Sequence, residues 1–169
     1  MSMNHITARG HVDAFLVDPG GRRTRVAGGP NTLLYSCADA VAAAFGGKAE
    51  RQPAVIGFVY GPKKGLDAAF AFSDGDRTPR TQAELAGTGL QVYDQRIDHN
   101  RSFAAGAPEY AGNVVTFRAM KPDAGARVCV YGVVLKDAAG SVLAVKRFEE
   151  CVVQNSGYAF AVSWSVTFN

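Results

Sequence analysis

The chain has 169 residues, 47% of them hydrophobic and 20% charged, and a formal net charge of +3, which suits one domain spanning residues 1–169. The small charge, on basic residues that are not interleaved with aromatic ones, argues against a nucleic-acid partner. No apolar run reaches the roughly 18 residues of a membrane helix, and the first residues lack the apolar segment of a secretory signal, so we expect no membrane partner and synthesis in a cytoplasm.

The first predicted element is a hairpin. Gly10 to Asp18 contains HVDAFLVD, which predicts a strand, the turn DPGG follows, and RRTRVA returns as the second strand. Gly28-Gly29-Pro30 is interpreted as the break that ends it. We expect this N-terminal hairpin or arm, residues 1–30, to contact a neighbouring subunit.

One helix is predicted after this break. Asn31 or Thr32 would cap it, apolar residues recur near helical spacing as far as Phe45, and Gly46-Gly47 would end it. Cys37 lies within this segment.

The middle of the chain has one clear strand and several weaker segments. Ala54 to Gly61 is apolar on both faces, which predicts an interior strand covered on both sides. Leu66 to Phe72 favours another strand, Pro79 to Leu85 a short helical turn, Leu90 to Asp98 a weakly alternating strand, and Phe103 to Gly112 a loop.

Four stronger strands are predicted at the end of the chain: Asn113 to Met120, Ala126 to Leu135, Ser141 to Phe148, and the terminal stretch YAFAVSWSVTFN. KPDAG, KDAAG and QNSG stand between them and are typical of turns that join antiparallel neighbours. The fold class expected is therefore mainly β, an antiparallel β-sandwich or jelly-roll-like barrel with one helix.

The terminal strand alternates between two kinds of side chain. One face carries large apolar residues and predicts core: Tyr158, Phe160, Val162, Trp164, Val166 and Phe168. The other face is small and weakly polar, which favours the approach of another subunit. The candidate interface consists of this small face and the arginines of the hairpin: Ala159, Ala161, Ser163, Ser165, Arg22, Arg23 and Arg25.

Motifs for catalysis or cofactor binding are not found: there is no P-loop, dinucleotide fingerprint, GxSxG elbow or HExxH. Asp74 and Asp76 could hold a hard cation, but a plain polar turn is the preferred interpretation. Glu149-Glu150 would point to opposite faces of a strand and is interpreted as a solvated strand end. We therefore expect no catalytic residue, no metal site and no cofactor.

Cysteine and histidine do not form a recognisable site either. Cys129 and Cys151 lie among valines and predict small buried side chains, and the sparse, odd number of cysteines argues against disulfides and zinc. His5 and His11 could flank a metal if the N-terminus folded back, although lone histidines in such a stretch are usually just polar. An unrecognised enzyme would need acidic residues near His99 or a metal. Both stay as alternatives.

The order of these segments resembles small structural proteins of tailed bacteriophage virions. The resemblance covers Asn31 to Asn169, from NTLLYSCADAVAAAFGG and RQPAVIGFVYG through TPRTQAELAG, GNVVTFRAM and VCVYGVVLKDAAGSVLAVKRF to FAVSWSVTF. The hairpin up to Pro30 has no counterpart in that group.

The resemblance implies a non-enzymatic virion component, either a capsid cement or decoration protein or a tail component of the baseplate or fibre. Its partners would be the major capsid protein or tail proteins and further copies of itself, and it would be assembled in the bacterial host cytoplasm. The alternative is a carbohydrate-binding sandwich used in host attachment, with Trp164 or tyrosines as the sugar platform; core is the preferred interpretation of Trp164.

Overall fold

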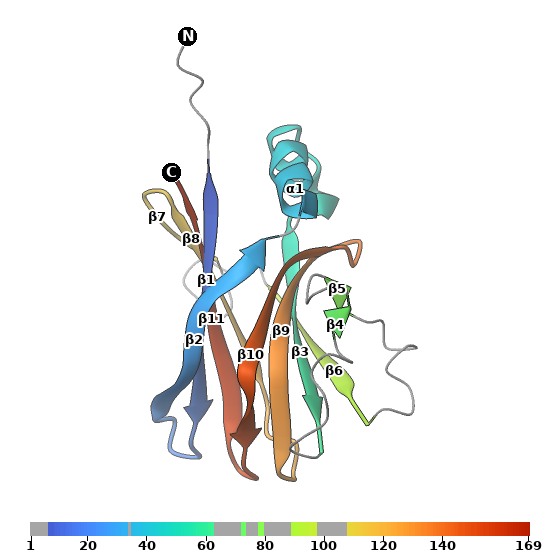
Figure 1. The fold of residues 1–169 in the computed structure, drawn as a ribbon. Coiled ribbons are helices and arrows are strands. Elements are labelled where there is room, and N and C mark those ends of the chain that lie inside the picture. The colour runs from blue at the N-terminus through green and yellow to red at the C-terminus, as the bar shows by residue number, and fades with distance from the viewer. Residues whose placement is uncertain (1–6, 34, 63–71, 74–77, 80–88, 98–107) are drawn as a thin grey trace.

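A single curled sheet makes up most of the computed structural model, which describes residues 7–33, 35–62, 72–73, 78–79, 89–97 and 108–169. The sheet has nine antiparallel strands in the order β6-β3-β9-β10-β2-β1-β11-β8-β7 (Figure 1). Their bounds are β1 Ala8–Val17, β2 Arg23–Leu33, β3 Pro53–Gly61, β6 Gln91–Arg96, β7 Glu109–Ala111, β8 Val114–Lys121, β9 Val128–Asp137, β10 Val142–Gln154 and β11 Ala159–Phe168.

The remaining described elements are short. Helix α1, Tyr35–Phe45, lies beyond one end of the sheet and is followed by the 3-10 turn η1, Ala49–Arg51 (Figure 1). Strands β4, Phe72–Ser73, and β5, Thr78–Pro79, form a separate small ladder. The expected antiparallel β fold with one helix is confirmed for the described part of the chain, as one curled sheet that forms a half-barrel.

The core lies inside the curl, where the two halves of the sheet face each other. Phe160 of β11 meets Phe58 of β3 edge to face, with ring centroids 6.0 Å apart, and Phe148 of β10 at the same distance. Such aromatic contacts add to the hydrophobic free energy of burial. Strands that are distant in the sheet order are thus held together by this cluster.

Strand β11 is confirmed as core. It pairs with β1 on one side and β8 on the other. Phe160, Val162, Trp164 and Val166 are at most 4% exposed. Backbone hydrogen bonds of 2.8 Å in both directions between Thr7 and Asn169 continue the pairing beyond the strand.

The predicted start of the helix was wrong. Asn31 and Thr32 belong to β2, where Asn31 lies opposite Gly10 and Thr32 opposite Val145, and α1 begins only at Tyr35. The supposed break at residues 28–30 is also part of β2. The strand continues through these residues because Gly29 adopts φ +136°, a conformation that favours glycine. The carbonyl of Pro30 accepts a 2.9 Å hydrogen bond from Lys146 Nζ.

Other strand predictions differ mainly in length. The interior position of β3 between β6 and β9 is confirmed. The predicted strand end at Phe148 was wrong, because β10 continues to Gln154. Glu149 and Glu150 therefore lie in an irregular part of this strand, and both are exposed. Strand β7 occupies part of the predicted loop at residues 103–112.

Several predicted features lie wholly or mostly outside the described residues. They are the strand at residues 66–72, the turn at 79–85, the acidic pair Asp74 and Asp76, and the histidines His5 and His99.

A buried polar pair lies where β8 ends. Lys121 is 2% exposed, its Nζ donates to Gln154 Oε1 at 2.9 Å, and it lies 4.4 Å from the ring centroid of Tyr60. Gln154 in turn donates to the carbonyls of Pro122 and Tyr158 at 3.0 and 2.7 Å. Burial lowers the pKa of Lys121, against the opposing charge of Asp123.

The lowered pKa predicts that stability rises with pH in the alkaline range. Between the lowered pKa of Lys121 and the ordinary lysine pKa of about 10.4, the unfolded chain holds a proton that the folded chain has released. Urea denaturation from neutral pH upward should show the free energy of unfolding of Lys121→Met rising less steeply than that of the unchanged protein. The exposed Lys48→Met is the matched control; equal slopes for all three would contradict the prediction.

Trp164 offers a test of the core. Trp164→Asp should lower the free energy of unfolding by about 4 kcal/mol or more, because a carboxylate would have to be buried without a partner. Trp164→Phe should cost less than about 2 kcal/mol, since an aromatic ring is kept and Nε1 has no hydrogen-bond partner within the described structure. Denaturant titration measures both, and an equal cost for the two variants would contradict the assignment.

Candidate protein interface

The outer face of strands β2, β1, β11 and β8 brings together residues from three distant parts of the sequence. Arg25, Phe15, Ala161 and Met120 lie directly opposite one another, in that order, across the four strands. Because directly opposite residues in an antiparallel sheet share a face, this row points away from the core. It is apolar in the middle and basic at one end.

Two further rows border this one. Arg23, Val17 and Ala159 form one, across β2, β1 and β11. Gly28, Asp13, Ser163 and Arg118 form the other, across all four strands. Arginines therefore stand on both sides of the apolar row.

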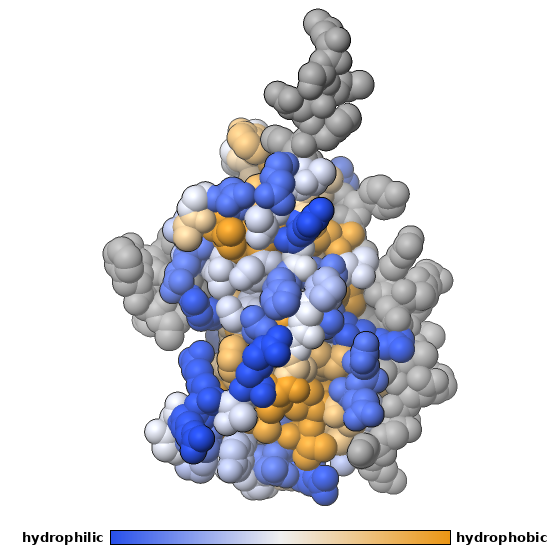
Figure 2. All heavy atoms as spheres, turned by 60° about the vertical axis from the view of Figure 1, so that its left-hand side comes forward, coloured by the Kyte–Doolittle hydropathy of each residue, from blue (hydrophilic) through white to orange (hydrophobic). Residues whose placement is uncertain are grey.

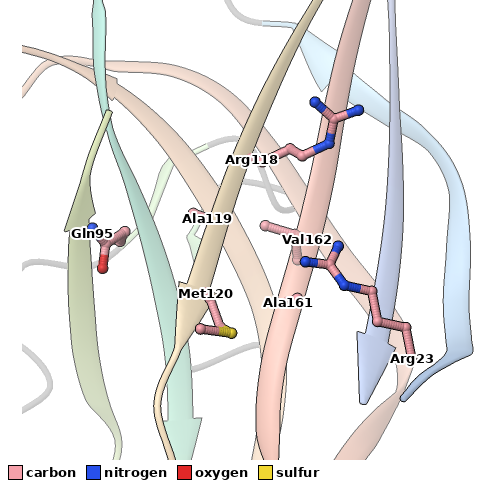
Figure 3. A pocket seen from close by; sticks show the side chains of 7 residues that line it. All are labelled: Arg23, Gln95, Arg118, Ala119, Met120, Ala161 and Val162. Carbon is pink, nitrogen blue, oxygen red and sulfur yellow. The ribbon is translucent and has the colours of Figure 1, made fainter. Parts of the chain in front are cut away.

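The arginines frame a shallow hollow of about 220 Å³. Arg23 reaches from β2 towards β11, and Arg118 extends from β8 over the same strand (Figure 3). Ala161 and Met120 line the hollow between them, and Gln95 of β6 adds an amide from beyond β8. The hollow thus combines aliphatic surface with two guanidinium groups.

Part of this apolar surface is open to solvent. Met120 is 47% exposed, whereas Phe15 is partly buried and Ala161 is 3% exposed. Figure 2 shows hydrophobic surface in the lower part of the molecule from this side, with hydrophilic residues on either side. An apolar centre with a polar rim is the usual arrangement of a protein interface.

Asp13 holds one of the arginines in place. Its Oδ1 accepts a 2.8 Å hydrogen bond from Arg25 Nε and lies 3.3 Å from His11 Nε2. Partial burial acts to raise the pKa of Asp13, but the hydrogen bonds and positive charges of Arg25 and His11 outweigh it, so this pKa lies below its ordinary value. The pair stabilises the fold at neutral pH, and its contribution is lost as the pH falls through that lowered pKa.

The other arginines differ in their partners. Arg118 forms an ion pair with Glu109 of β7. Arg23 has no carboxylate partner among the described residues, and the exposed Arg22 lies in the turn between β1 and β2, where its backbone N–H donates to Asp18. Arg23 is thus available on this face to an acidic partner.

The structure places the predicted interface residues of β11 and β2 on this one face, whereas Arg22 lies in the turn. The small side chains of β11 contribute little accessible surface. Ala161 is already covered within the chain, and Ala159, Ser163 and Ser165 are partly buried. Ser165 Oγ also lies 3.1 Å from Thr116 Oγ1, within hydrogen-bonding distance. These small side chains form the floor of the face.

Sequence reasoning missed Phe15, Met120 and Arg118, which supply much of the accessible surface here. The alternation of β1 and β8 in the sequence shows which side chains share a face within each strand. It does not show that these two strands flank β11, so no signal in the sequence pointed to the combination.

The groups considered for chemistry are dispersed over the described residues. Cys129 is 3% exposed and Cys151 is half-buried, so the prediction of burial is confirmed fully only for Cys129. Cys37 lies on α1, and burial raises the pKa of its thiol, which disfavours a thiolate nucleophile. Trp164, at 0% exposure, is not a sugar platform.

The described ranges hold neither a cluster of metal ligands nor a membrane-spanning helix. No group of three or more His, Cys, Asp or Glu side chains there is arranged to hold a metal ion. None of the helices in those ranges is long and apolar enough to cross a membrane.

Comparison with known proteins gave no match to a family model, a curated protein or a solved structure.

The contact between Arg25 and Asp13 can be tested through the glycine beside it. A Cβ at position 28 would lie 2.1 Å from Arg25 Nη2 and 2.6 Å from Asp13 Oδ1, so Gly28→Ala should push the flexible Arg25 side chain away. The pKa of Asp13 should then rise, although the charge of Arg25 is retained. NMR titration of the Asp13 carboxyl measures this, with Arg25→Ala as the comparison; an unchanged pKa in both variants would contradict the role of Arg25.

Proposed function

We propose that this protein is a non-enzymatic structural subunit of a tailed bacteriophage virion, a capsid cement or decoration protein or a tail component. It docks on another virion protein through the outer face of β2, β1, β11 and β8. The resemblance of Asn31 to Asn169 to such proteins supports the virion assignment. The outer face supports the docking role.

The observation that carries the docking role is the apolar row framed by arginines. Met120 and Phe15 supply apolar area, and methionine, aromatic and arginine side chains are the types enriched at the centres of protein interfaces. Arg23 reaches over this area without a carboxylate partner among the described residues. An acidic side chain of the partner would complete it with a charge-assisted hydrogen bond.

The same face suits assembly because it is rigid. It is built on four paired strands, with β1 and β11 in the interior of the sheet. A partner that binds here does not have to order a flexible segment, which keeps the entropic cost of association low.

The test is binding to phage particles. Heads and tails assembled without this subunit are prepared separately, mixed with the purified protein and sedimented. We expect the protein to sediment with one of the two, which also decides between a cement and a tail role. Arg23→Glu and Met120→Glu should each weaken this binding at least tenfold. Arg23→Glu would set a like charge against the acidic side chain of the partner, and Met120→Glu would place a charge in the apolar surface.

The control is Lys48→Glu, an equivalent charge reversal at an exposed position just beyond α1. It should bind as the unchanged protein does, and circular dichroism should show that all three variants are folded. A protein that sediments with neither heads nor tails would contradict the virion role. Binding that ignores both face variants would contradict the docking surface while leaving the virion role in place.

A further inference from the structure

A cavity of about 200 Å³ lies between α1 and the inner face of the sheet. On the helix side it is lined by Cys37, Ala40, Val41 and Ala44, which form one stripe at helical spacing. These side chains are small. The helix therefore covers this end of the half-barrel (Figure 1) without filling the space beneath it.

The chemistry of the cavity is apolar. Phe117 and Leu135 contribute core side chains to its wall, and none of its lining residues is charged. Its polar side chains are Gln52 and Tyr110, which are both exposed, Tyr110 to 77%. A charged occupant would lose its hydration without compensation, so the cavity suits an uncharged apolar group.

A matching group stands at the same end of the molecule. Phe45, next to Ala44 in the chain, is 90% exposed, the highest exposure among the large hydrophobic side chains of the described residues. The helix end below it is well fixed: Gly47 has φ +76° and donates to the Ala44 carbonyl at 3.0 Å, and Lys48 donates to Ala43 at 2.9 Å. These two hydrogen bonds form a Schellman motif, so the exposed ring belongs to an ordered helix end.

We propose that two copies of this chain associate by exchanging Phe45. The ring of each copy enters the apolar cavity of the other, beside Tyr110, and the result is a symmetric dimer joined through its α1 ends. The proposal does not depend on the virion role, since it concerns only contacts of the chain with itself.

Size and symmetry favour a second copy as the occupant. A cavity of about 150 Å³ is known to hold benzene, so the cavity of about 200 Å³ found here has room for one phenyl ring. Because ring and cavity lie at the same end of the chain, one two-fold axis makes the contact twice. A free small molecule in the cavity would leave Phe45 exposed, whereas a second copy covers it.

The test is the mass of the purified protein by light scattering over a dilution series. We expect a dimer. Phe45→Ser should raise its dissociation constant by about 100-fold or more, because two central apolar contacts are lost and each is worth about tenfold or more. Ala40→Leu, which places a larger side chain in the cavity and leaves Phe45 intact, should do the same.

The controls separate this contact from general effects on the fold. Val26→Ser removes another exposed apolar side chain, on β2, and should leave the dimer unchanged. Cys37→Leu fills the cavity from the same stripe and replaces Ala40→Leu if that variant does not fold. Phe45→Ser keeps its cavity, and Ala40→Leu keeps its ring. An equimolar mixture of the two should therefore form mixed dimers, in which one ring enters one cavity, more readily than either variant associates with itself.

Trp164 gives a second measurement. It lies directly opposite Phe117, a cavity residue, and it is the only tryptophan in the chain. Its emission should change when the unchanged protein is diluted and should not change when Phe45→Ser is diluted. A protein that is monomeric at its highest soluble concentration, or a dimer that ignores both Phe45→Ser and the cavity-filling variant, overturns the proposal. A saturable change in Trp164 emission when benzene is added to such a monomer would assign the cavity to small apolar ligands instead.

Discussion

The packing of Phe160 against Phe58 and Phe148 is the contact on which the rest of the structure depends. These three rings come from β11, β3 and β10. In the sheet order, β9 and β10 are among the strands that separate β3 from β11. A single nine-stranded sheet can bury one of its faces by curling back on itself. The aromatic cluster adds to the apolar burial that makes this curl favourable. It also sets which faces of β11, β3 and β10 point inward.

The outer face of β2, β1, β11 and β8 follows from this constraint. Once Phe160 and Trp164 point inward, strand alternation places Ala161 and Ser163 outward. Pairing with β1 and β2 then carries Phe15 and the hairpin arginines to the same side. The hairpin is paired within its own chain on both sides, since β1 binds β11 and β2 reaches β10. Its proposed contact with another protein therefore uses its face.

The two proposed contact surfaces rely on different physical chemistry. The outer face offers guanidinium groups around a shallow apolar hollow, which suits an acidic partner and gives binding that weakens with salt. The α1 end offers an exposed ring and an uncharged cavity, where affinity comes from excluded water and shape. They lie on different parts of the molecule, so one copy can use both at the same time. A subunit of this kind could join to itself at one end and to a larger assembly along its side.

The sequence by itself determined the elements whose pattern is strictly local. The alternation from Tyr158 to Phe168 predicted the buried face of β11, and Gly46-Gly47 predicted the end of α1, because strand period and glycine conformation are properties of neighbouring residues. Only the tertiary structure decided the start of the helix: the residues expected to cap it, Asn31 and Thr32, extend β2 because Gly10 and Val145 pair with them. The sequence placed only some residues of the proposed interface together, for the same reason. Its floor on β11 and its arginines are local patterns, whereas the meeting of Phe15, Met120 and Arg118, and the space beneath Ala40, depend on strand order and packing between residues far apart in the chain.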